Sequence, residues 1–153
     1  MSDETPPIIN GWTILLHPFF RAQMAELRAD VERARARDSA SFHKKNAAKR
    51  FAAALKLAFE VIPQDPGNPI YRQGHTLGPE NAHWRRAKFL QQYRLFFRYD
   101  LNARIIIHVW MNDENSKRAY DSKTDAYAVF RRKLASGDPP SEWDELLDAS
   151  VSP

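Results

Sequence analysis

Two long segments near the amino terminus place apolar residues every three or four positions, the spacing typical of an amphipathic helix. The first runs from about Phe20 to Arg37, and the second from about Lys44 to Ile62, where Pro63 ends it. Their apolar stripes are Met24, Leu27, Val31 and Ala34 in the first segment, and Ala47, Ala48, Phe51, Leu55, Ala58 and Ile62 in the second. The pattern predicts an αα-hairpin that covers a sheet.

Between residues 84 and 113 the pattern changes to an alternation typical of strands, with turns at 90–92 and 100–102. One face of this predicted meander is apolar: Ala87, Phe89, Tyr93, Leu95, Phe97, Tyr99, Ile105, Ile107, Val109 and Met111. The other face is mainly basic and aromatic: Trp84, Arg86, Lys88, Arg94, Phe96, Arg98, Ile106, His108, Trp110 and Asn112. We expect the αα-hairpin to pack on the first face, against Leu95, Phe97, Ile105, Ile107 and Val109, and to leave the second face open.

The remaining pattern completes an α+β domain. An apolar strand lies within Asn10–Phe20 and ends at His17-Pro18. A helix from about Thr124 to Ala135 is followed by a last short helix near Ser141, which we expect to be its N-cap. We predict one domain over residues 10–149, with residues 1–9 and 150–153 as tails. The Pro- and Gly-rich connection 63–82 is long for a compact domain, and such loops tend to be functional.

Composition excludes several kinds of chemistry. The chain of 153 residues has no Cys, so disulfides, thiolate metal sites and cysteine nucleophiles are excluded. No apolar run approaches a membrane span, and residues 1–9 are acidic and contain proline, unlike a secretory signal. We therefore expect a cytoplasmic protein, and nothing in the sequence points to a cofactor or a metal site.

Positive charge is concentrated in the predicted strands. Residues 82–108 hold six Lys and Arg against one acidic residue, whereas the formal net charge of the whole chain is +4. Guanidinium groups between aromatic rings on a sheet face suit a nucleic-acid strand, which offers phosphates and stackable bases. A second basic block at 44–56 holds five Lys and Arg, and we interpret it as the solvated face of a helix.

Several runs of residues are more specific than charge. They are Tyr-Arg-Leu-Phe-Phe-Arg-Tyr (93–99), Trp-Met-Asn-Asp-Glu (110–114), Arg-Ala-Tyr (118–120) and Lys-Thr-Asp-Ala-Tyr (123–127). With Asn10-Gly11-Trp12, His17-Pro18 and the Pro139-Pro140 pair before Trp143, these runs resemble the YhaV family of bacterial toxins, within the RelE-like superfamily. The resemblance covers nearly the whole chain. It implies a RelE-like fold, a small antiparallel or mixed sheet with an αα-hairpin on one face and C-terminal helices.

The resemblance also implies a function. It implies an endoribonuclease, an mRNA interferase, that cleaves mRNA free or on the ribosome and so inhibits translation. Such a toxin is held inactive, in a hetero-oligomer, by a PrlF-like antitoxin. We expect the antitoxin to bind across or beside the basic face, with Trp110 and Arg94 as anchors.

RelE-like enzymes place a basic pair two residues apart on one strand, an Arg on the next strand, and an Arg and a Tyr after the last strand. The residues at matching positions are Arg86, Lys88, Arg94, Arg118 and Tyr120, with Arg85 as an alternative to Arg86. Further RNA contacts are expected from Arg85, Arg98, His108, Trp110, Asn112 and Lys123. Tyr93, Tyr99 and Tyr127 are interpreted as packing residues.

The chemistry implied by the resemblance needs no metal, because the 2′-OH of RNA can attack the adjacent phosphate. The Arg fork can pair bidentately with phosphate oxygens. Lys88 can act as base or acid, Asp113 is the alternative base, and Tyr120 or His108 is the alternative acid. The alternative function is a non-catalytic RNA- or ribosome-binding inhibitor that uses the same basic face.

Overall fold

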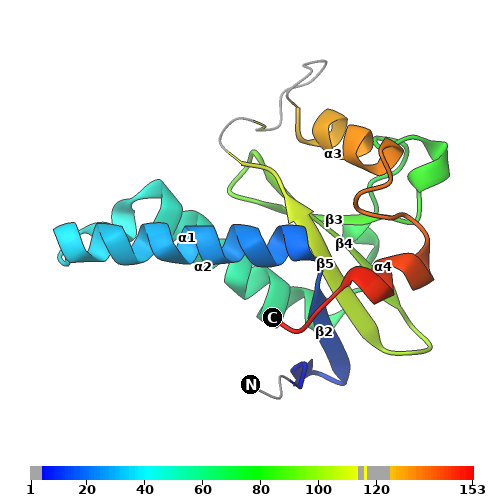
Figure 1. Ribbon diagram of the computed structural model, residues 1–153, viewed down its shortest axis with the longest axis horizontal. Helices are drawn as coiled ribbons and strands as arrows, with labels where there is room; N and C mark the ends of the chain where they lie inside the picture. Colours follow the sequence, from blue (N-terminus) through cyan, green and yellow to red (C-terminus); the bar gives the residue numbers. More distant parts are fainter. Residues whose placement is uncertain (1–4, 114–115, 117–124) are drawn as a thin grey trace.

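The computed structural model describes residues 5–113, 116 and 125–153. Its centre is a five-stranded mixed sheet with strand order β1-β2-β5-β4-β3 (Figure 1). The strands are β1 (Ile8–Ile9), β2 (Trp12–Leu16), β3 (Arg85–Phe89), β4 (Tyr93–Asp100) and β5 (Ile105–Met111). The helices are α1 (Pro18–Arg37), α2 (Asn46–Lys56), α3 (Ala126–Ala135) and α4 (Trp143–Ala149). The α+β prediction is confirmed.

The strands β3, β4 and β5 form the predicted antiparallel meander, whereas β2 pairs with β5 in parallel. A parallel pair needs a long crossover connection, which the segment carrying α1, α2, β3 and β4 supplies. Ile8 and Ile9, expected in the amino-terminal tail, form β1 on the outer edge of β2. At the other end of β2, the backbone N–H and carbonyl groups of Val151 bond to the carbonyl and N–H groups of Leu16.

The helical hairpin α1–α2 covers one face of the sheet. α1 starts at Pro18, whose missing N–H is harmless in a first turn, and the Nδ1 atom of His17 accepts a bond from the Phe19 N–H at 3.0 Å. The buried core on this side contains Ile14, Phe20, Leu27, Ala54, Ala58, Ile62, Leu95 and Phe97, among others. None of the described helices is long and apolar enough to cross a membrane.

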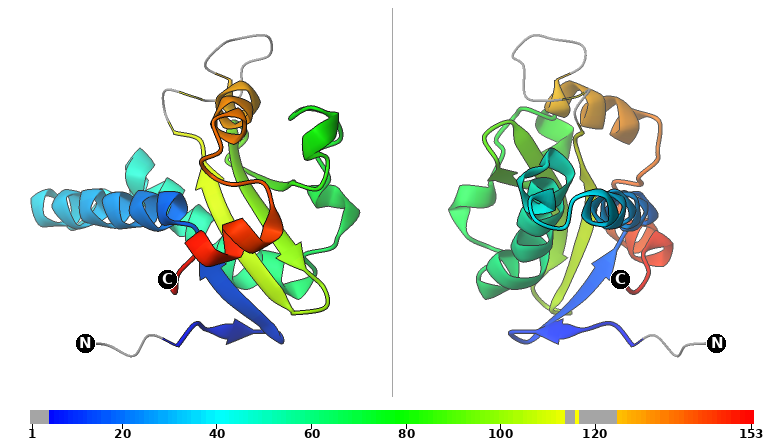
Figure 2. Two further views of the ribbon diagram at one scale, coloured as in Figure 1. Left: turned by 45° about the vertical axis from the view of Figure 1, so that its right-hand side comes forward. Right: turned by 90° about the vertical axis from the view of Figure 1, so that its left-hand side faces the viewer.

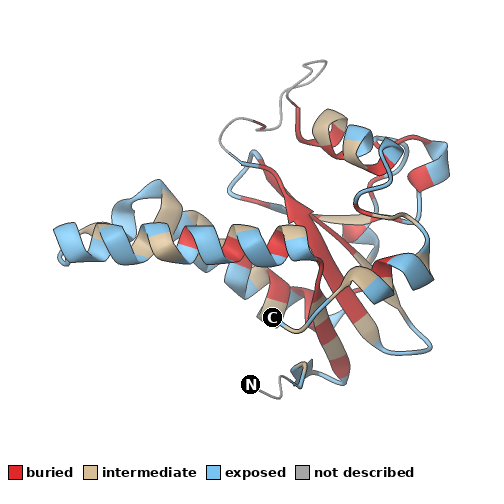
Figure 3. Ribbon diagram, in the orientation of Figure 1, coloured by how far each residue is buried: buried red, intermediate tan, exposed pale blue. Residues whose placement is uncertain are grey.

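The opposite face of the sheet is also covered, so the expectation of an open basic face is wrong. α3 and α4 lie on this side and bury Phe96, Ile107, Val109, Trp110, Phe130, Leu134 and Leu146 (Figure 2). Figure 3 shows buried residues along the strands and on the helix segments that face them. The aromatic residues of the basic face therefore serve mainly to pack α3, because the ring of Phe96 stacks on that of Phe130 at 4.3 Å.

A β-bulge in β5 explains why its two faces were assigned incorrectly. Phe96 pairs with Trp110, but the next residue, Phe97, pairs with His108, so Val109 is an extra residue on its strand. Trp110 lies on the face of the sheet that the alternation predicts. The residues of β5 before it lie on the faces opposite to those predicted. Ile106 and His108 therefore face the helical hairpin, and Ile107 and Val109 face the α3 side. For β4, the prediction that Leu95 and Phe97 lie under the hairpin is confirmed.

His108 has a structural role that the chain itself creates. After α2 the helix widens into one π turn, Leu57–Val61, in which Ile62 donates to the carbonyl of Leu57. The next donor in that register would be Pro63, which has no N–H, so this register supplies no backbone donor to the carbonyl of Ala58. The Nε2 atom of the fully buried His108 donates to this carbonyl at 2.8 Å. Burial lowers the pKa of His108 to about 4, so the ring is neutral at physiological pH.

Candidate active site

Two guanidinium groups from adjacent strands meet at one hydroxyl group. Arg86 on β3 donates from Nε to the Tyr127 hydroxyl at 2.8 Å, and Arg94 on β4 donates from Nε to the same oxygen at 3.2 Å. Tyr127 lies in the first turn of α3, and its ring meets that of Phe96 edge-on at 5.6 Å. The sheet and α3 therefore jointly position two cations around a buried phenol.

Arg94 is held more tightly than an ordinary surface arginine. Only 6% of the residue is exposed, and its Nη1 donates to the carbonyls of Gln91 and Tyr93 at 2.7 and 3.0 Å. Its backbone N–H donates to the Asn112 side-chain oxygen at 2.6 Å. These bonds use Nε and Nη1, and Nη2 has no bond to any residue that the structure describes. Among the residues that the structure describes, no carboxylate pairs with Arg86 or Arg94.

Lys88 completes a group of three cations. It is the cross-strand partner of Arg94, and its exposed side chain shares the face of Arg86 because the two are two residues apart on β3. Arg86 also donates from Nη1 to the Ile70 carbonyl at 2.8 Å, which ties β3 to the connection 63–82. Within the described part of the chain these three cations form no ion pair with a carboxylate, which favours a bound anion, and a phosphate group matches the guanidinium fork.

Arg85 lies on the other face of β3 and is not part of this group. It donates to the carbonyls of Ala82 and His83 at 3.2 and 3.3 Å, and its guanidinium lies 5.8 Å from the ring centre of Tyr99. Between the two alternatives left by the sequence, the geometry therefore favours Arg86 as the partner of Lys88 and Arg94.

Arg98 shares the face of Arg94 but lies away from this group. Its guanidinium lies between the rings of Trp84 and Trp143, at 5.6 and 5.3 Å, and it donates to the carbonyl of Ser141. Burial lowers the pKa of Arg98. These contacts attach the segment before α4 to the sheet, so an RNA contact by Arg98 would compete with them.

Three of the expected RNA contacts are buried. His108 faces the helical hairpin, Trp110 lies beneath α3 against Phe130, and the amide of Asn112 bonds to Gln92 and Ser116 carbonyls. Their exposed fractions are 0%, 6% and 0%, so the expectation that they face RNA is wrong for this conformation. His108 is buried because the β-bulge turns it toward the helical hairpin, and Trp110 is buried because α3 docks over it.

The remaining predicted residues lie in or next to the connection between β5 and α3. Arg118, Tyr120 and Lys123 are outside the described residues. Asp113 is exposed at the end of β5, where it bonds with Ser116. At the other end of the connection, the buried Asp125 caps α3 by accepting the Tyr127 N–H at 3.0 Å. Asn112 and Tyr127 both bond to Arg94, so the connection begins and ends beside that residue.

Tyr127 is the site residue that the sequence interpretation missed. It was taken as a packing residue, and its ring does pack, but its hydroxyl joins Arg86 to Arg94. The signal in the sequence was Asp125, an N-cap residue two positions earlier, which places Tyr127 in the first turn of a helix.

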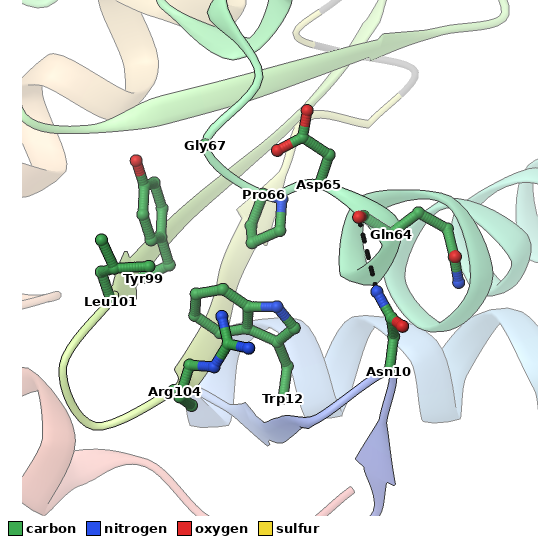
Figure 4. Close-up of a pocket in the computed structure, with 9 residues that line it drawn as sticks. All are labelled: Asn10, Trp12, Gln64, Asp65, Pro66, Gly67, Tyr99, Leu101 and Arg104. Atoms are coloured by element: carbon green, nitrogen blue, oxygen red, sulfur yellow. Dashed lines mark hydrogen bonds between the residues drawn. The ribbon is translucent and has the colours of Figure 1, made fainter.

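A separate pocket of about 540 Å³ lies at the other end of the sheet (Figure 4). Arg104 lies over the Trp12 ring at 4.9 Å, and Asn10 donates to the Pro63 carbonyl at 3.1 Å. None of the predicted site residues lines it, so it is distinct from the Arg86–Arg94 group. Among the residues described here, no three His, Asp or Glu side chains are grouped to hold a metal ion.

The structure is that of a small α+β protein in which two guanidinium groups meet beside a lysine, an arrangement that suits phosphate. Residues 14–151 match the family model described as a toxin with endonuclease activity, of a toxin–antitoxin system. The chain therefore belongs to the YhaV family of endonuclease toxins.

Two relatives illustrate the similarity. The chain is 42% identical over 145 residues to Toxin YhaV of Escherichia coli O6:H1, and that alignment spans 94% of each chain. It is also 42% identical over 145 residues, 94% of each chain, to Ribonuclease toxin YhaV of Escherichia coli strain K12. No solved structure matches the chain.

Proposed function

We propose that this toxin is a metal-independent endoribonuclease that cleaves mRNA by attack of a 2′-OH on the adjacent phosphate, and thereby inhibits translation in the cytoplasm. The convergence of Arg86 and Arg94 on the Tyr127 hydroxyl carries the proposal, because it pre-positions two guanidinium groups where one phosphate can be bound. The strain K12 relative is named a ribonuclease toxin, which supports RNA as the substrate.

The reaction needs charge stabilisation and two proton transfers. The 2′ oxygen attacks phosphorus and loses its proton to a base, the bond from phosphorus to the 5′ oxygen breaks, and that oxygen takes a proton. The products are a 2′,3′-cyclic phosphate and a 5′-hydroxyl end. Arg94 and Arg86 stabilise the charge that develops on the phosphate oxygens, and they act without reorganising because their Nε atoms are already bonded.

The proposed proton-transfer groups are two bases and two acids. Lys88 and Asp113 are both exposed and are the proposed bases. Tyr120 and Arg118 keep their proposed roles as acid and phosphate contact, and Tyr127 joins Tyr120 as a proposed acid. His108, an alternative acid on sequence grounds, is enclosed on the opposite side of the sheet and takes no part.

A PrlF-like antitoxin is the proposed inhibitor. It cannot anchor on Trp110 in this conformation, since that ring lies under α3. Neutralisation then follows either from an acidic segment that covers Lys88 and Arg86 or from displacement of α3, which would remove Tyr127 from the site.

The test is cleavage of RNA by the purified chain, with and without EDTA and with and without ribosomes. Fragments with cyclic-phosphate ends that persist in EDTA support the proposal. Intact RNA with a mobility shift would instead establish the non-catalytic inhibitor, and loss of cleavage in EDTA would contradict metal independence.

Arg94 provides the second arm of the test. Arg94→Ala should lower the single-turnover rate by about 10²–10³, as for loss of an oxyanion donor, and should lower RNA affinity far less. Arg94→Lys should rescue poorly because a point charge cannot reproduce the fork. Equal losses in binding and rate would show that Arg94 only anchors phosphate. A thermal transition confirms that each variant is folded, since Arg94 is buried.

A further inference from the structure

A stripe of lysines follows the exposed face of α2, away from the candidate active site. Lys45 is the N-cap residue, Lys49 lies four residues further on, and Lys56 is the last residue of the helix. All three are exposed. At 3.6 residues per turn they fall on one narrow side of the helix, opposite the fully buried Ala54 and Ala58. We call these three residues the lysine stripe.

The charge around the stripe is unbalanced. Residues 39–59 contain five Lys and Arg and no Asp or Glu. Within the described residues, none of the three lysines forms an ion pair, although Lys45 acts at longer range on Asp38, whose pKa is lowered mainly by its bonds to Ser41 and also by Lys45. α1 in the same hairpin differs, because Arg28 pairs with Glu32 at 3.5 Å and Arg33 pairs with Asp30.

The hairpin extends away from the sheet, as Figures 1 and 3 show, and no residue from Arg28 to Ala53 is buried. The lysines therefore do not serve the core. The position of Lys45 also disfavours the helix, because it forms no side-chain cap and the first turn contains no acidic residue, whereas Lys56 lies in the last turn, where the dipole favours a cation. Cations at the N-terminal end of a helix oppose its dipole, so helix stability does not explain the lysine at position 45.

We infer that the lysine stripe binds the phosphate backbone of RNA, as a second contact outside the cleavage site. Along the helix axis, Lys45 and Lys49 are about 6 Å apart and Lys49 and Lys56 about 10 Å apart, from a rise of about 1.5 Å per residue. Flexible point charges on such a line contact phosphates without reading base sequence. This inference rests on the proposed function for its choice of RNA as ligand.

The stripe fits RNA better than an acidic protein segment. Between Lys49 and Lys56 the same side of the helix presents Ala52 and Ala53, and no aromatic residue. Protein interfaces are anchored by buried aromatic and Arg side chains, and lysine is depleted in them.

The experiment compares two double variants of the full chain that remove the same charge from the same hairpin. Lys45→Gln with Lys49→Gln removes two cations of the stripe. Arg28→Gln with Arg33→Gln removes two cations that carboxylates already neutralise. Binding of a 2′-O-methyl RNA, which has no free 2′-OH to attack phosphorus, is measured by fluorescence anisotropy over a range of salt concentrations.

The stripe variant should bind roughly tenfold more weakly, and its log–log salt slope should be shallower by about 1.4, since each single-strand phosphate contact contributes about 0.7. The control variant should change affinity by less than about twofold. Equal weakening of both variants would mean that only net charge matters, and no weakening of either would mean that RNA does not touch the stripe. Both results overturn the inference.

Cleavage assays separate this inference from the proposed function. The stripe variant should keep its single-turnover rate at saturating RNA and need more RNA to reach half of it, whereas Arg94→Ala should lower the saturating rate. If the wild-type chain binds RNA but does not cut it, the proposed function fails, and the binding comparison still decides the role of the stripe.

Discussion

The Tyr127 hydroxyl joins the two guanidinium groups, and it can be removed while the aromatic ring is kept. Tyr127→Phe keeps the ring against Phe96 but leaves the Nε atoms of Arg86 and Arg94 without their acceptor. We expect cleavage to slow by about 10- to 100-fold, from the loss of charge-assisted hydrogen bonds. Single-turnover kinetics at saturating RNA measure this effect.

Tyr99→Phe is the matched control for that substitution. It removes a hydroxyl group from the same sheet, but Tyr99 lines the pocket at the other end of β4. Its rate should match that of the wild-type chain. A Tyr127→Phe enzyme that cuts as fast as the control would return Tyr127 to the role of a packing residue.

His108 makes the stability of the fold depend on pH. Burial lowers its pKa to about 4 in the folded state, whereas an unfolded chain has an ordinary value of about 6.5. The unfolded state therefore binds more protons between these values, so stability is complete above about pH 6.5 and is lost as the pH falls toward 4. We expect a loss of about 2 kcal/mol in the free energy of unfolding between pH 7 and pH 5.

Urea titrations of wild type and His108→Gln at several pH values check this expectation. Gln keeps a donor for the Ala58 carbonyl but does not titrate, so the variant should be less dependent on pH in this range. A shallower slope should remain, because burial also lowers the pKa values of His17 and His83. If the pH dependence is the same with Gln, protonation of His108 does not limit stability.

At the scale of the element, α2 offers a way to separate stability from RNA binding. Lys45→Asp supplies a capping carboxylate at a helix N-terminus that has none, and it places negative charge at the positive end of the dipole. We expect the fold to gain about 1 kcal/mol, or about 2–4 °C in thermal midpoint, while RNA binding weakens.

Differential scanning calorimetry and anisotropy on the same sample measure both effects. Lys45→Gln is the control, since it removes the charge without adding a cap, and its midpoint should stay close to that of wild type. A more stable Lys45→Asp protein with unchanged RNA affinity would leave the cation at this position unexplained.

For the molecule as a whole, the sheet carries two cores that should differ in their link to activity. Phe96 and Phe97 are adjacent and fully buried, but Phe96 packs under α3 and Phe97 under the helical hairpin. Phe96→Leu and Phe97→Leu should each destabilise the fold by about 1–2 kcal/mol. Only Phe96→Leu should also slow cleavage, because its ring supports Tyr127.

Thermal midpoints should therefore fall by similar amounts, about 3–6 °C, in the two variants. Activity is compared well below both transitions, so that unfolding does not contribute. Equal loss of activity in both would mean that the site depends on the sheet as a whole rather than on the α3 side.

Much of the fold was predictable because local rules decided it. The order and approximate positions of β3, β4 and β5, the helical hairpin and the α3 helix follow from apolar spacing, prolines and turn residues, although α2 ends at Lys56 and is followed by a π turn instead of running to Ile62. The sidedness of β5 was not predictable, since nearly every residue from Ile105 to Met111 is apolar and one bulge reverses the phase. The docking of α3 over the basic face was missed for a related reason. Aromatic rings that can stack on bases can also stack on Phe130.

By itself, the sequence determined the class of the fold, the family, and the basic residues Arg86, Lys88 and Arg94 on one face of two neighbouring strands. It could do so because strand alternation and helical spacing act over a few residues. Only the tertiary structure decided which basic residues converge. It brought Tyr127 of α3, 33 positions along the chain from Arg94, to the two guanidinium groups, and it placed Arg98, His108 and Trp110 in the packing. Contacts between distant segments depend on how whole elements dock, which no local pattern encodes.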